Sequence, residues 1–362
     1  MSFYDAIARP LLFSFDAERA HGLSIAALKL GLPLCPPPPV SPRLAVKIAG
    51  LDFPNPLGMA AGYDKNAEIP DALLKLGFGF VECGTLTPKP QPGNPAPRIF
   101  RLVEDRAVIN RMGFNNEGHQ PALARAMKRA PQGGIVGINV GANKDSEDRI
   151  ADYEEGVRLF ASVASYLTIN ISSPNTVGLR ALQERESLAE LLTRVTQARD
   201  SQAKGLGPST PVFLKIAPDL NEQALEDIAA EVLDKRIDGV IVSNTTLSRD
   251  GLKSAEAKEA GGLSGAPLFE RSTIVQAKMR RLIGPWLPII GAGGVDSAET
   301  ALEKIRAGAD LVQLYTSLIY GGPQLPGRIL RDMDKQLLTL GVSSVTELRD
   351  TRLDDWANRP LN

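Results

Sequence analysis

Cysteine and histidine are both scarce in this sequence, with two of each among 362 residues. Cys35 and Cys83 lie far apart in unlike contexts, so they predict neither a disulfide framework nor a zinc-binding spacing. A reducing compartment is the simpler inference from so little cysteine. His21 and His119 are too few and too distant for a histidine metal site or a Ser-His-Asp triad. We therefore expect no metal.

Two other features are missing: a surplus of charge of one sign and a long apolar run. The chain has 41 basic and 42 acidic residues, which are interspersed and give a net charge of −1. A nucleic-acid-binding protein would show a basic surplus on one face, so we expect no nucleic-acid partner. No apolar run is long enough to span a bilayer, and no signal peptide is apparent. The protein is expected to be cytoplasmic or to rest on a membrane surface.

Short apolar runs rich in β-branched residues recur along the chain from about residue 55, and longer helical patterns separate them. Continuous apolar runs are typical of strands that are covered on both faces. Strict alternation of strand and helix predicts an α/β fold, a (β/α)8 TIM barrel. A doubly wound open sheet is the alternative, but its usual G-x-G-x-x-G turn does not follow the first strand. The strand candidates are PLGMA, GFVECG, IVGINV, YLTINIS, VFLKIA, GVIVSN, PIIGAG and LVQLYT.

Start and stop signals delimit the helical patterns between these strands. Ser146, Asn221 and Ser297 are expected N-caps, and Gly308 is an expected C-terminal glycine. Residues 97–113 do not fit the alternation, and we expect them to form a β-hairpin near the barrel mouth.

The N-terminal segment, residues 1–40, is expected to be an extension of two short helices and a stiff, proline-rich linker, followed by the barrel domain at 41–362. Pro10 should kink or shorten the first helix. Asp16 should cap the second helix, and Gly31 with Pro33 should end it. The pair either packs on the flank of the barrel or rests in a membrane interface.

Polar residues follow nearly every predicted strand, at the end of the barrel where enzymes of this fold carry their sites. Neutral amides can bind a flat heterocycle that alternates N–H and C=O groups, and a lysine suits a carboxylate or an anionic ring edge. No facing pair of carboxylates suggests glycosidase chemistry. The amides are Asn110, Asn139, Asn170, Asn175 and Asn244, and the lysines are Lys65 and Lys215.

A glycine-rich turn, GAGGV at 291–295, closes the seventh strand just before the helix that starts near Ser297. In a barrel this is the usual phosphate position, where backbone N–H groups and a helix N-terminus meet an anion. GGLSG at 261–265 is a second loop of this kind. A phosphate site beside an amide-lined mouth predicts flavin mononucleotide (FMN) as cofactor.

Seven motifs follow one another along the chain: AAGYDKN, NRMGFNN, NISSPNT, LKIAPD, SNTT, GGLSG and GAGGV. Taken together, they resemble those of the dihydroorotate dehydrogenase family, in register from about residue 44 to residue 330. The resemblance implies oxidation of (S)-dihydroorotate to orotate in de novo pyrimidine (UMP) biosynthesis, with FMN as hydride acceptor and a membrane quinone as final electron acceptor.

The extension of two N-terminal helices, and a serine at position 173 where the soluble class carries cysteine, make the chain similar to the quinone-dependent, membrane-associated class. That similarity implies a peripheral membrane protein on the cytoplasmic side of the cell membrane, attached through its N-terminal helices. Residues 1–40 would then give access to membrane and quinone, and residues 41–362 would form the FMN-binding catalytic domain.

The resemblance also implies a role for each matching residue. Ser173 would be the catalytic base. The orotate pocket would comprise Lys65, facing the substrate carboxylate, with Asn110, Arg111, Met112, Gly113, Phe114, Asn175, Asn244 and Thr245. The quinone site would comprise His21, Arg101 and Tyr315. The residues implied for FMN are Ala61, Gly62, Tyr63, Asp64, Lys65, Thr85, Asn139, Asn170, Lys215, Ser243, Gly265, Gly294, Tyr315 and Thr316.

Rival interpretations remain open. Another barrel flavoenzyme, such as a dihydropyrimidine or dihydrouridine reductase, would not need Lys65 together with the amides of the orotate pocket. The soluble dihydroorotate enzyme would lack the N-terminal helices and carry cysteine at position 173. A non-catalytic flavin-binding module would have no use for Ser173 or Lys215. His21 could equally be a solvated surface residue.

Overall fold

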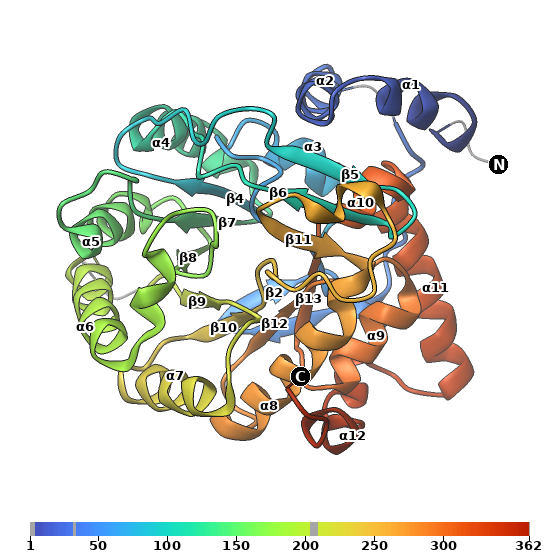
Figure 1. Cartoon of the computed structure of the whole chain (residues 1–362). Coiled ribbons are helices and arrows are strands. Elements are labelled where there is room, and N and C mark those ends of the chain that lie inside the picture. Colours follow the sequence, from blue (N-terminus) through green and yellow to red (C-terminus); the bar gives the residue numbers. More distant parts are fainter. Residues whose placement is uncertain (1–3, 32–33, 203–208, 362) are drawn as a thin grey trace.

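Eight parallel strands close into a barrel, and helices surround it (Figure 1). The computed structural model describes residues 4–31, 34–202 and 209–361. The closed sheet confirms the predicted TIM barrel with its N-terminal helices and excludes the open sheet. All eight predicted strands are present, as β3 (Leu57–Met59), β4 (Phe80–Leu86), β7 (Ile135–Val140), β8 (Tyr166–Asn170), β9 (Val212–Ile216), β10 (Gly239–Val242), β12 (Ile289–Ala292) and β13 (Leu311–Leu314).

The helices that follow the strands form the outer layer, and the short β1–β2 hairpin (Val46–Ile48 and Leu51–Phe53) precedes the first barrel strand. The last helix, α12 (Leu353–Ala357), packs against α8. The outer helices are α3 (Pro70–Lys75), α4 (His119–Arg129), α5 (Arg149–Phe160), α6 (Arg185–Gln202), α7 (Glu222–Asp234), α8 (Phe269–Ile283), α9 (Ala298–Arg306), α10 (Thr316–Gly321) and α11 (Leu325–Leu340).

Helix caps test the local predictions. Asn221 caps α7, and Ser297 caps α9 in a capping box, as predicted. Gly308 has a φ of +106° just after α9, which suits glycine. The prediction of Ser146 for α5 is wrong, because the helix begins later and Asp148 accepts the backbone N–H of its third residue at 3.0 Å. A carboxylate there also complements the positive end of the helix dipole.

The predicted hairpin in residues 97–113 is confirmed as β5 (Ile99–Leu102) paired with β6 (Ala107–Asn110). A third strand, β11 (Gly262–Gly265), pairs with β6 in antiparallel register. The sequence did not predict β11, because its glycines indicate a loop. The resulting sheet brings the second glycine-rich segment against the hairpin.

Aromatic rings fill the barrel at the amino ends of its strands. Phe80, Tyr166 and Phe213 stack edge to face in one row. A β-carbon added at Gly58 would lie 2.2 Å from the ring of Phe80, and one added at Gly137 would lie 2.2 Å from the ring of Tyr166. Only glycine at these two positions leaves space for the rings. This aromatic floor closes one end of the barrel interior.

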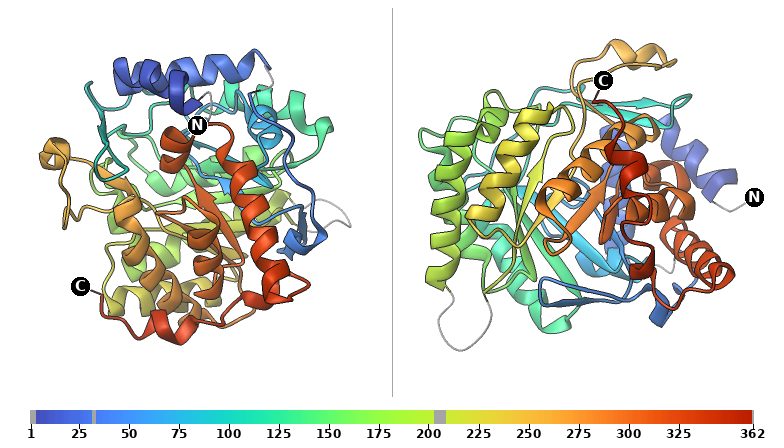
Figure 2. Two further views of the ribbon diagram at one scale, coloured as in Figure 1. Left: turned by 90° about the vertical axis from the view of Figure 1, so that its right-hand side faces the viewer. Right: turned by 90° about the horizontal axis from the view of Figure 1, so that it is seen from below.

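The N-terminal segment crosses the barrel at one end, and α2 packs against β5 and α3 (Figure 2, left). It consists of a π-helix (Tyr4–Ala8), α1 (Arg9–Ser14) and α2 (Ala17–Lys29). Among the described residues, no helix is long and apolar enough to cross a membrane.

The predicted boundaries of these helices are largely confirmed. Pro10 lies in the first turn of α1, where the π-helix gives way to the α-helix. Asp16 caps α2 by accepting the N–H groups of its second and third residues. Gly31 follows α2 with a φ of +67°, and Pro33 lies outside the described residues.

The caps of α5 give a direct test of stability. Asp148→Ala should lower the free energy of unfolding by about 1 kcal/mol, because it removes an N-cap oxygen. Ser146→Ala should leave it nearly unchanged, and Asp148→Asn should keep most of the stability because the amide oxygen still caps. Urea unfolding followed by circular dichroism measures all three. A larger loss for Ser146→Ala than for Asp148→Ala would contradict the observed helix start.

Candidate active site

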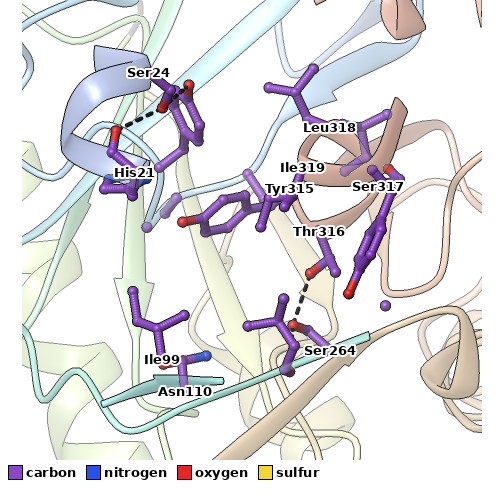
Figure 3. Close-up of a pocket in the computed structure, with 18 of the residues that line it drawn as sticks. His21, Ser24, Ile99, Asn110, Ser264, Tyr315, Thr316, Ser317, Leu318 and Ile319 are labelled. Carbon is purple, nitrogen blue, oxygen red and sulfur yellow. Dashed lines mark hydrogen bonds between the residues drawn. The ribbon is translucent and has the colours of Figure 1, made fainter. Parts of the chain in front are cut away.

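A cavity of about 470 Å³ opens at the carboxyl ends of the barrel strands, beneath the N-terminal helices. Figure 3 shows His21 and Ser24 of α2 on one side, Tyr315 and the start of α10 on another, and Asn110 with Ser264 of the hairpin sheet below. The volume falls in the range of about 300–1,000 Å³ that is typical of sites for small molecules.

Most of the predicted site residues meet in this cavity. For the predicted base and substrate pocket, the structure places in its wall Ser173, Lys65, Asn110, Met112, Gly113, Phe114, Asn175, Asn244 and Thr245. For the predicted cofactor and quinone sites, it places there Ala61, Gly62, Tyr63, Thr85, Asn170, Lys215, Ser243, Gly265, Gly294, Tyr315, Thr316, His21 and Arg101.

Three predicted residues do not line the cavity: Asp64, Asn139 and Arg111. The Asp64 carboxylate accepts backbone N–H groups of its own loop and so shapes the turn that carries Lys65. Arg111 turns away, with its guanidinium 2.7 Å from the carboxylate of Glu259. Neighbouring residues of an extended chain point in opposite directions, and the motif alone does not say which of them faces the site.

The loop after β8 holds Ser173 among uncharged groups. Its side chain is buried, and its Oγ accepts the backbone N–H of Asn175 at 3.3 Å. The neighbouring Ser172 Oγ instead donates to Asn170 Oδ1 at 2.8 Å and accepts from Asn244 Nδ2 at 2.9 Å. The two serines therefore differ: Ser172 braces the loop, and Ser173 faces the cavity.

Arg180, which the sequence reasoning missed, ties three loops together around this serine. Its guanidinium donates to the carbonyl oxygens of Ser172 and Thr245, each at 2.9 Å. It also pairs with the carboxylate of Asp219 at 2.8 Å. The contacts reach the loops after β8, β10 and β9, so Arg180 fixes their spacing. Nothing in the motif around it distinguishes this arginine from a solvated one.

A buried carboxylate, Glu82, lies between the aromatic floor and the cavity. It accepts hydrogen bonds from Asn139 Nδ2 at 2.7 Å, Gln313 Nε2 at 2.9 Å and the Tyr166 hydroxyl at 3.2 Å. Lys215 Nζ lies 3.8 Å away and is itself buried. The negative charge of Glu82 is thereby satisfied and holds Lys215 at the base of the cavity.

Hydrogen bonds continue from Glu82 to the β8 loop. Thr85 Oγ1 donates to Asn139 Oδ1 at 2.6 Å and accepts from Asn170 Nδ2 at 2.8 Å. Since Asn139 also donates to Glu82, the barrel centre and the loop of Ser173 belong to one network. Asn139 therefore acts on the site from below the cavity wall.

A cradle of glycines forms the opposite wall. A β-carbon on Gly294 would lie 2.4 Å from the Phe269 β-carbon, and one on Gly265 would lie 2.4 Å from the Arg106 carbonyl oxygen. Both glycines also have positive φ values. Close beside them Thr316 donates to Ser264 (Figure 3). The backbone is thus bare toward the cavity, as the predicted phosphate position requires.

Two buried side-chain atoms in residues of the cavity wall have no hydrogen-bond partner within the described chain: Thr245 Oγ1 and Gln313 Oε1. Buried polar atoms are almost always paired in folded proteins. Their position indicates a polar ligand that supplies the missing partners. The described residues contain no group of His, Cys, Asp and Glu side chains that could hold a metal ion.

Lys65 supplies a positive charge in the same wall. Its ammonium donates to the carbonyl oxygen of Gly62 at 2.7 Å. Burial lowers the pKa of Lys65 to about 8, and the carboxylate of Glu18 partly opposes that shift. The group is mostly protonated at neutral pH and suits an anionic ligand.

The N-terminal helices complete the cavity through aromatic contacts. The ring of His21 meets that of Tyr63 edge-on at 5.1 Å, and Tyr63 meets Tyr315 in the same way at 5.5 Å. Ser24 Oγ lies 2.9 Å from the Tyr63 hydroxyl. Burial lowers the pKa of His21 to about 3, so the ring is neutral. His21 is therefore part of the cavity wall, and its interpretation as a solvated surface residue is wrong.

Arg101 joins β5 to the end of α1. Its guanidinium donates to the carbonyl oxygens of Leu12, at 3.2 Å, and Phe15. It also lies over the ring of Phe13, 4.6 Å from the centroid. This arginine holds the N-terminal helices on the barrel in addition to lining the cavity.

Comparisons with known proteins agree with this arrangement. Residues 43–337 match the family model described as dihydroorotate dehydrogenase. A Chelativorans protein named dihydroorotate dehydrogenase (quinone) is 67% identical over 361 residues, which cover 100% of this chain and 99% of the relative. A Brucella anthropi protein of the same name is 64% identical, with 99% of each chain covered. The crystal structure of Eimeria tenella DHODH in complex with ferulenol superposes with a TM-score of 0.88 at 40% identity, covering 92% of this chain and 95% of that one.

The clamp made by Arg180 predicts local mobility when it is removed. Arg180→Gln should speed amide hydrogen exchange in residues 171–177 and 244–248 by about tenfold, since charged hydrogen bonds of this kind contribute about 1.5–3 kcal/mol. Hydrogen exchange with mass spectrometry measures the effect. Arg185→Gln, at a side chain that is 60% exposed, is the matched control and should change nothing there. Equal exchange in both variants would contradict the clamp.

Proposed function

The chain belongs to the dihydroorotate dehydrogenase family, and on this premise we propose that it oxidises (S)-dihydroorotate to orotate with FMN as hydride acceptor and a quinone as final electron acceptor, in de novo pyrimidine biosynthesis. It is an oxidoreductase. The observation that carries the proposal is one cavity that combines Lys65, Ser173 and four asparagine amides with a glycine cradle.

The residues of the barrel end fit FMN. Gly265 and Gly294 line the cavity with backbone alone, and a β-carbon at either position would lie 2.4 Å from an atom of Arg106 or Phe269, so only glycine fits there. Lys215 offers a charged donor to an isoalloxazine edge, and the second N–H of the Asn170 side-chain amide offers a neutral one. When bound, FMN supplies the hydride acceptor of the reaction. The charge of Lys215 is held in place by Glu82, so the site is organised before binding.

The residues on the hairpin side fit dihydroorotate. Lys65 would pair with the substrate carboxylate in a charge-assisted hydrogen bond. Asn175 Nδ2 and Asn110 Oδ1 bond to each other at 3.3 Å, a long contact that a ligand amide can replace. Thr245 Oγ1 has an open hydrogen-bonding capacity in the same wall.

Ser173 would take the proton from the ring carbon next to the one that loses hydride. Serine is a weak base at its free pKa and needs a partner or an exit for the proton. In the described chain its hydroxyl contacts only the Asn175 amide, and no histidine or carboxylate touches it. Its loop is instead held rigidly by Ser172 and Arg180, so positioning is the main contribution of the chain.

The test of the proposal is spectroscopic. Purified protein should be yellow, lose its flavin absorbance on anaerobic addition of dihydroorotate and regain it on addition of a quinone. A protein without flavin would contradict the FMN assignment. Bleaching by a dihydropyrimidine or by NADPH but not by dihydroorotate would favour the other barrel flavoenzymes.

The role of Ser173 predicts a selective kinetic defect. Ser173→Ala should keep its flavin and bind orotate, but the rate of flavin reduction should fall by about 10²–10⁴ because the base is missing. Ser173→Cys should keep part of the rate with a lower pH optimum, since a thiol ionises more readily. Stopped-flow absorbance measures the reduction. A normal rate of flavin reduction in Ser173→Ala would assign the proton to another group.

The pKa of Lys65 predicts how orotate affinity depends on pH. Lys65 carries its charge below a pKa of about 8 and loses it above, so orotate should bind progressively more weakly above that value, by up to about tenfold per pH unit. Titrations of the flavin spectrum with orotate, from about pH 6 to about pH 10, measure this. Lys65→Met should bind weakly at every pH. If the affinity of the wild-type protein for orotate stays constant over this pH range, Lys65 does not bind the orotate carboxylate.

We further propose that the protein is peripheral to the cytoplasmic side of the cell membrane and that quinone reaches the flavin between α1 and α2. Ile7 of the π-helix, Leu11 of α1 and Leu30 just after α2 are exposed by 56%, 59% and 74%. Three exposed apolar side chains on this short N-terminal segment suit binding to the membrane interface. His21, with its neutral ring, Arg101 and Tyr315 would hold the quinone carbonyls inside.

Membrane association is tested at those apolar residues. Replacing Ile7, Leu11 and Leu30 together by Glu should abolish flotation with lipid vesicles, because each apolar contact becomes a charge, while dihydroorotate should still bleach the flavin. Trp286→Glu is the matched control, since Trp286 is 94% exposed in the loop before β12, at the other end of the barrel. Unchanged flotation of the triple variant would place the attachment elsewhere.

A further inference from the structure

Lys304, on α9, is a fully buried lysine outside the cavity wall. Its ammonium donates to Ser272 Oγ at 2.9 Å and to Thr273 Oγ1 at 3.1 Å, both near the start of α8. It also lies 5.4 Å from the centroid of the Phe269 ring. Within the described residues, no carboxylate forms an ion pair with it. Its only hydrogen-bond partners there are neutral.

A lysine in this environment is unusual. Buried ammonium groups are normally paired with an anion, because leaving water costs them much free energy. Burial lowers the pKa of Lys304 to about 7, and no neighbouring charge opposes that shift. In the sequence, Lys304 stands between Glu303 and Ile305 in an ordinary helical pattern, and nothing there indicates that it is buried. The missing counter-charge indicates an anion that the chain itself does not provide.

The position of Lys304 points to that anion. Its hydrogen-bond partner Ser272 Oγ also lies 3.2 Å from the carbonyl oxygen of Gly293, in the glycine cradle. A β-carbon on Gly291 would lie 3.2 Å from Lys304 Cδ, so the lysine stem passes directly behind the glycine turn. The ammonium is therefore one hydroxyl group away from the backbone that faces the cavity.

The neighbouring charges do not neutralise it. Glu303 turns toward Arg352 and the indole N–H of Trp356. Glu270, in the first turn of α8, pairs with Arg359 at the surface. The start of α8 adds the positive end of a helix of 15 residues on the same side as Lys304.

We propose that Lys304 is a positioning residue for the phosphate of FMN, whose charge stabilises the dianion from behind the Gly293–Gly294 turn without touching it. The inference rests on the proposed binding of FMN. A dianion several ångströms away, at an effective dielectric constant of about 20, should feel this charge strongly. Loss of the charge should speed FMN release by about tenfold to a hundredfold and should hardly affect riboflavin, which has no phosphate.

The experiment uses the holoenzyme in the forms wild type, Lys304→Met and Lys304→Gln. Each is diluted, and flavin release is followed by recovery of flavin fluorescence. The measurement is repeated on protein in which riboflavin replaces FMN. Lys278→Met is the matched control, because it also removes one lysine charge. Lys278 lies on α8 and, unlike Lys304, pairs with a carboxylate, that of Glu222 at 2.8 Å. Lys304→Gln serves if the methionine variant does not fold, since its amide can still bond to Ser272.

Faster release of FMN but not of riboflavin in the Lys304 variants, with a normal rate in Lys278→Met, supports the inference. Equal acceleration for both flavins would show that Lys304 only supports packing, and unchanged rates would show that its charge does not reach the phosphate. Either outcome overturns the inference and leaves FMN binding intact. A wild-type protein that binds no flavin would instead contradict the proposed function, and the inference with it.

Discussion

The buried carboxylate of Glu82 is the constraint on which the rest of the site depends. A charge at the centre of a barrel is tolerated only when neighbours satisfy it, and removal of one partner of a buried pair costs about 3–5 kcal/mol. Asn139, Gln313 and Tyr166 converge on it, and Lys215 lies beside it. The donors that face the cavity are therefore fixed from below, by a buried group that does not itself line the cavity.

The layers of the barrel follow from the two-residue period of its strands. Phe80 and Glu82 project from the same side of β4, so the aromatic floor is succeeded by a polar layer and then by the open mouth. The floor keeps the cavity at one end, and Gly293 and Gly294 leave part of the wall above it without side chains. The charges of Lys215 and Lys65 then face the cavity, and that of Lys304 lies behind its wall.

Local patterns in the sequence were enough for the strands, the hairpin and the caps at Asn221 and Ser297, because each depends on neighbours along the chain. Most of the residues that the family motifs predicted for the site lie in the wall of one cavity. The prediction of Ser146 as the N-cap of α5 was wrong because Asp148, two residues later, can also cap a helix. The roles of Arg180 and Lys304 could not be predicted, since each depends on which loops and helices the closed barrel brings beside an ordinary basic residue.

The most direct measurement of the central claim is a crystal structure of the purified protein grown with orotate. The account predicts an FMN whose phosphate lies on Gly293 and Gly294. It also predicts an orotate whose carboxylate is within hydrogen-bonding distance of Lys65 Nζ, and whose ring carbon faces Ser173 Oγ. Orotate bound with its carboxylate away from Lys65, or flavin density outside this cavity, would contradict the account.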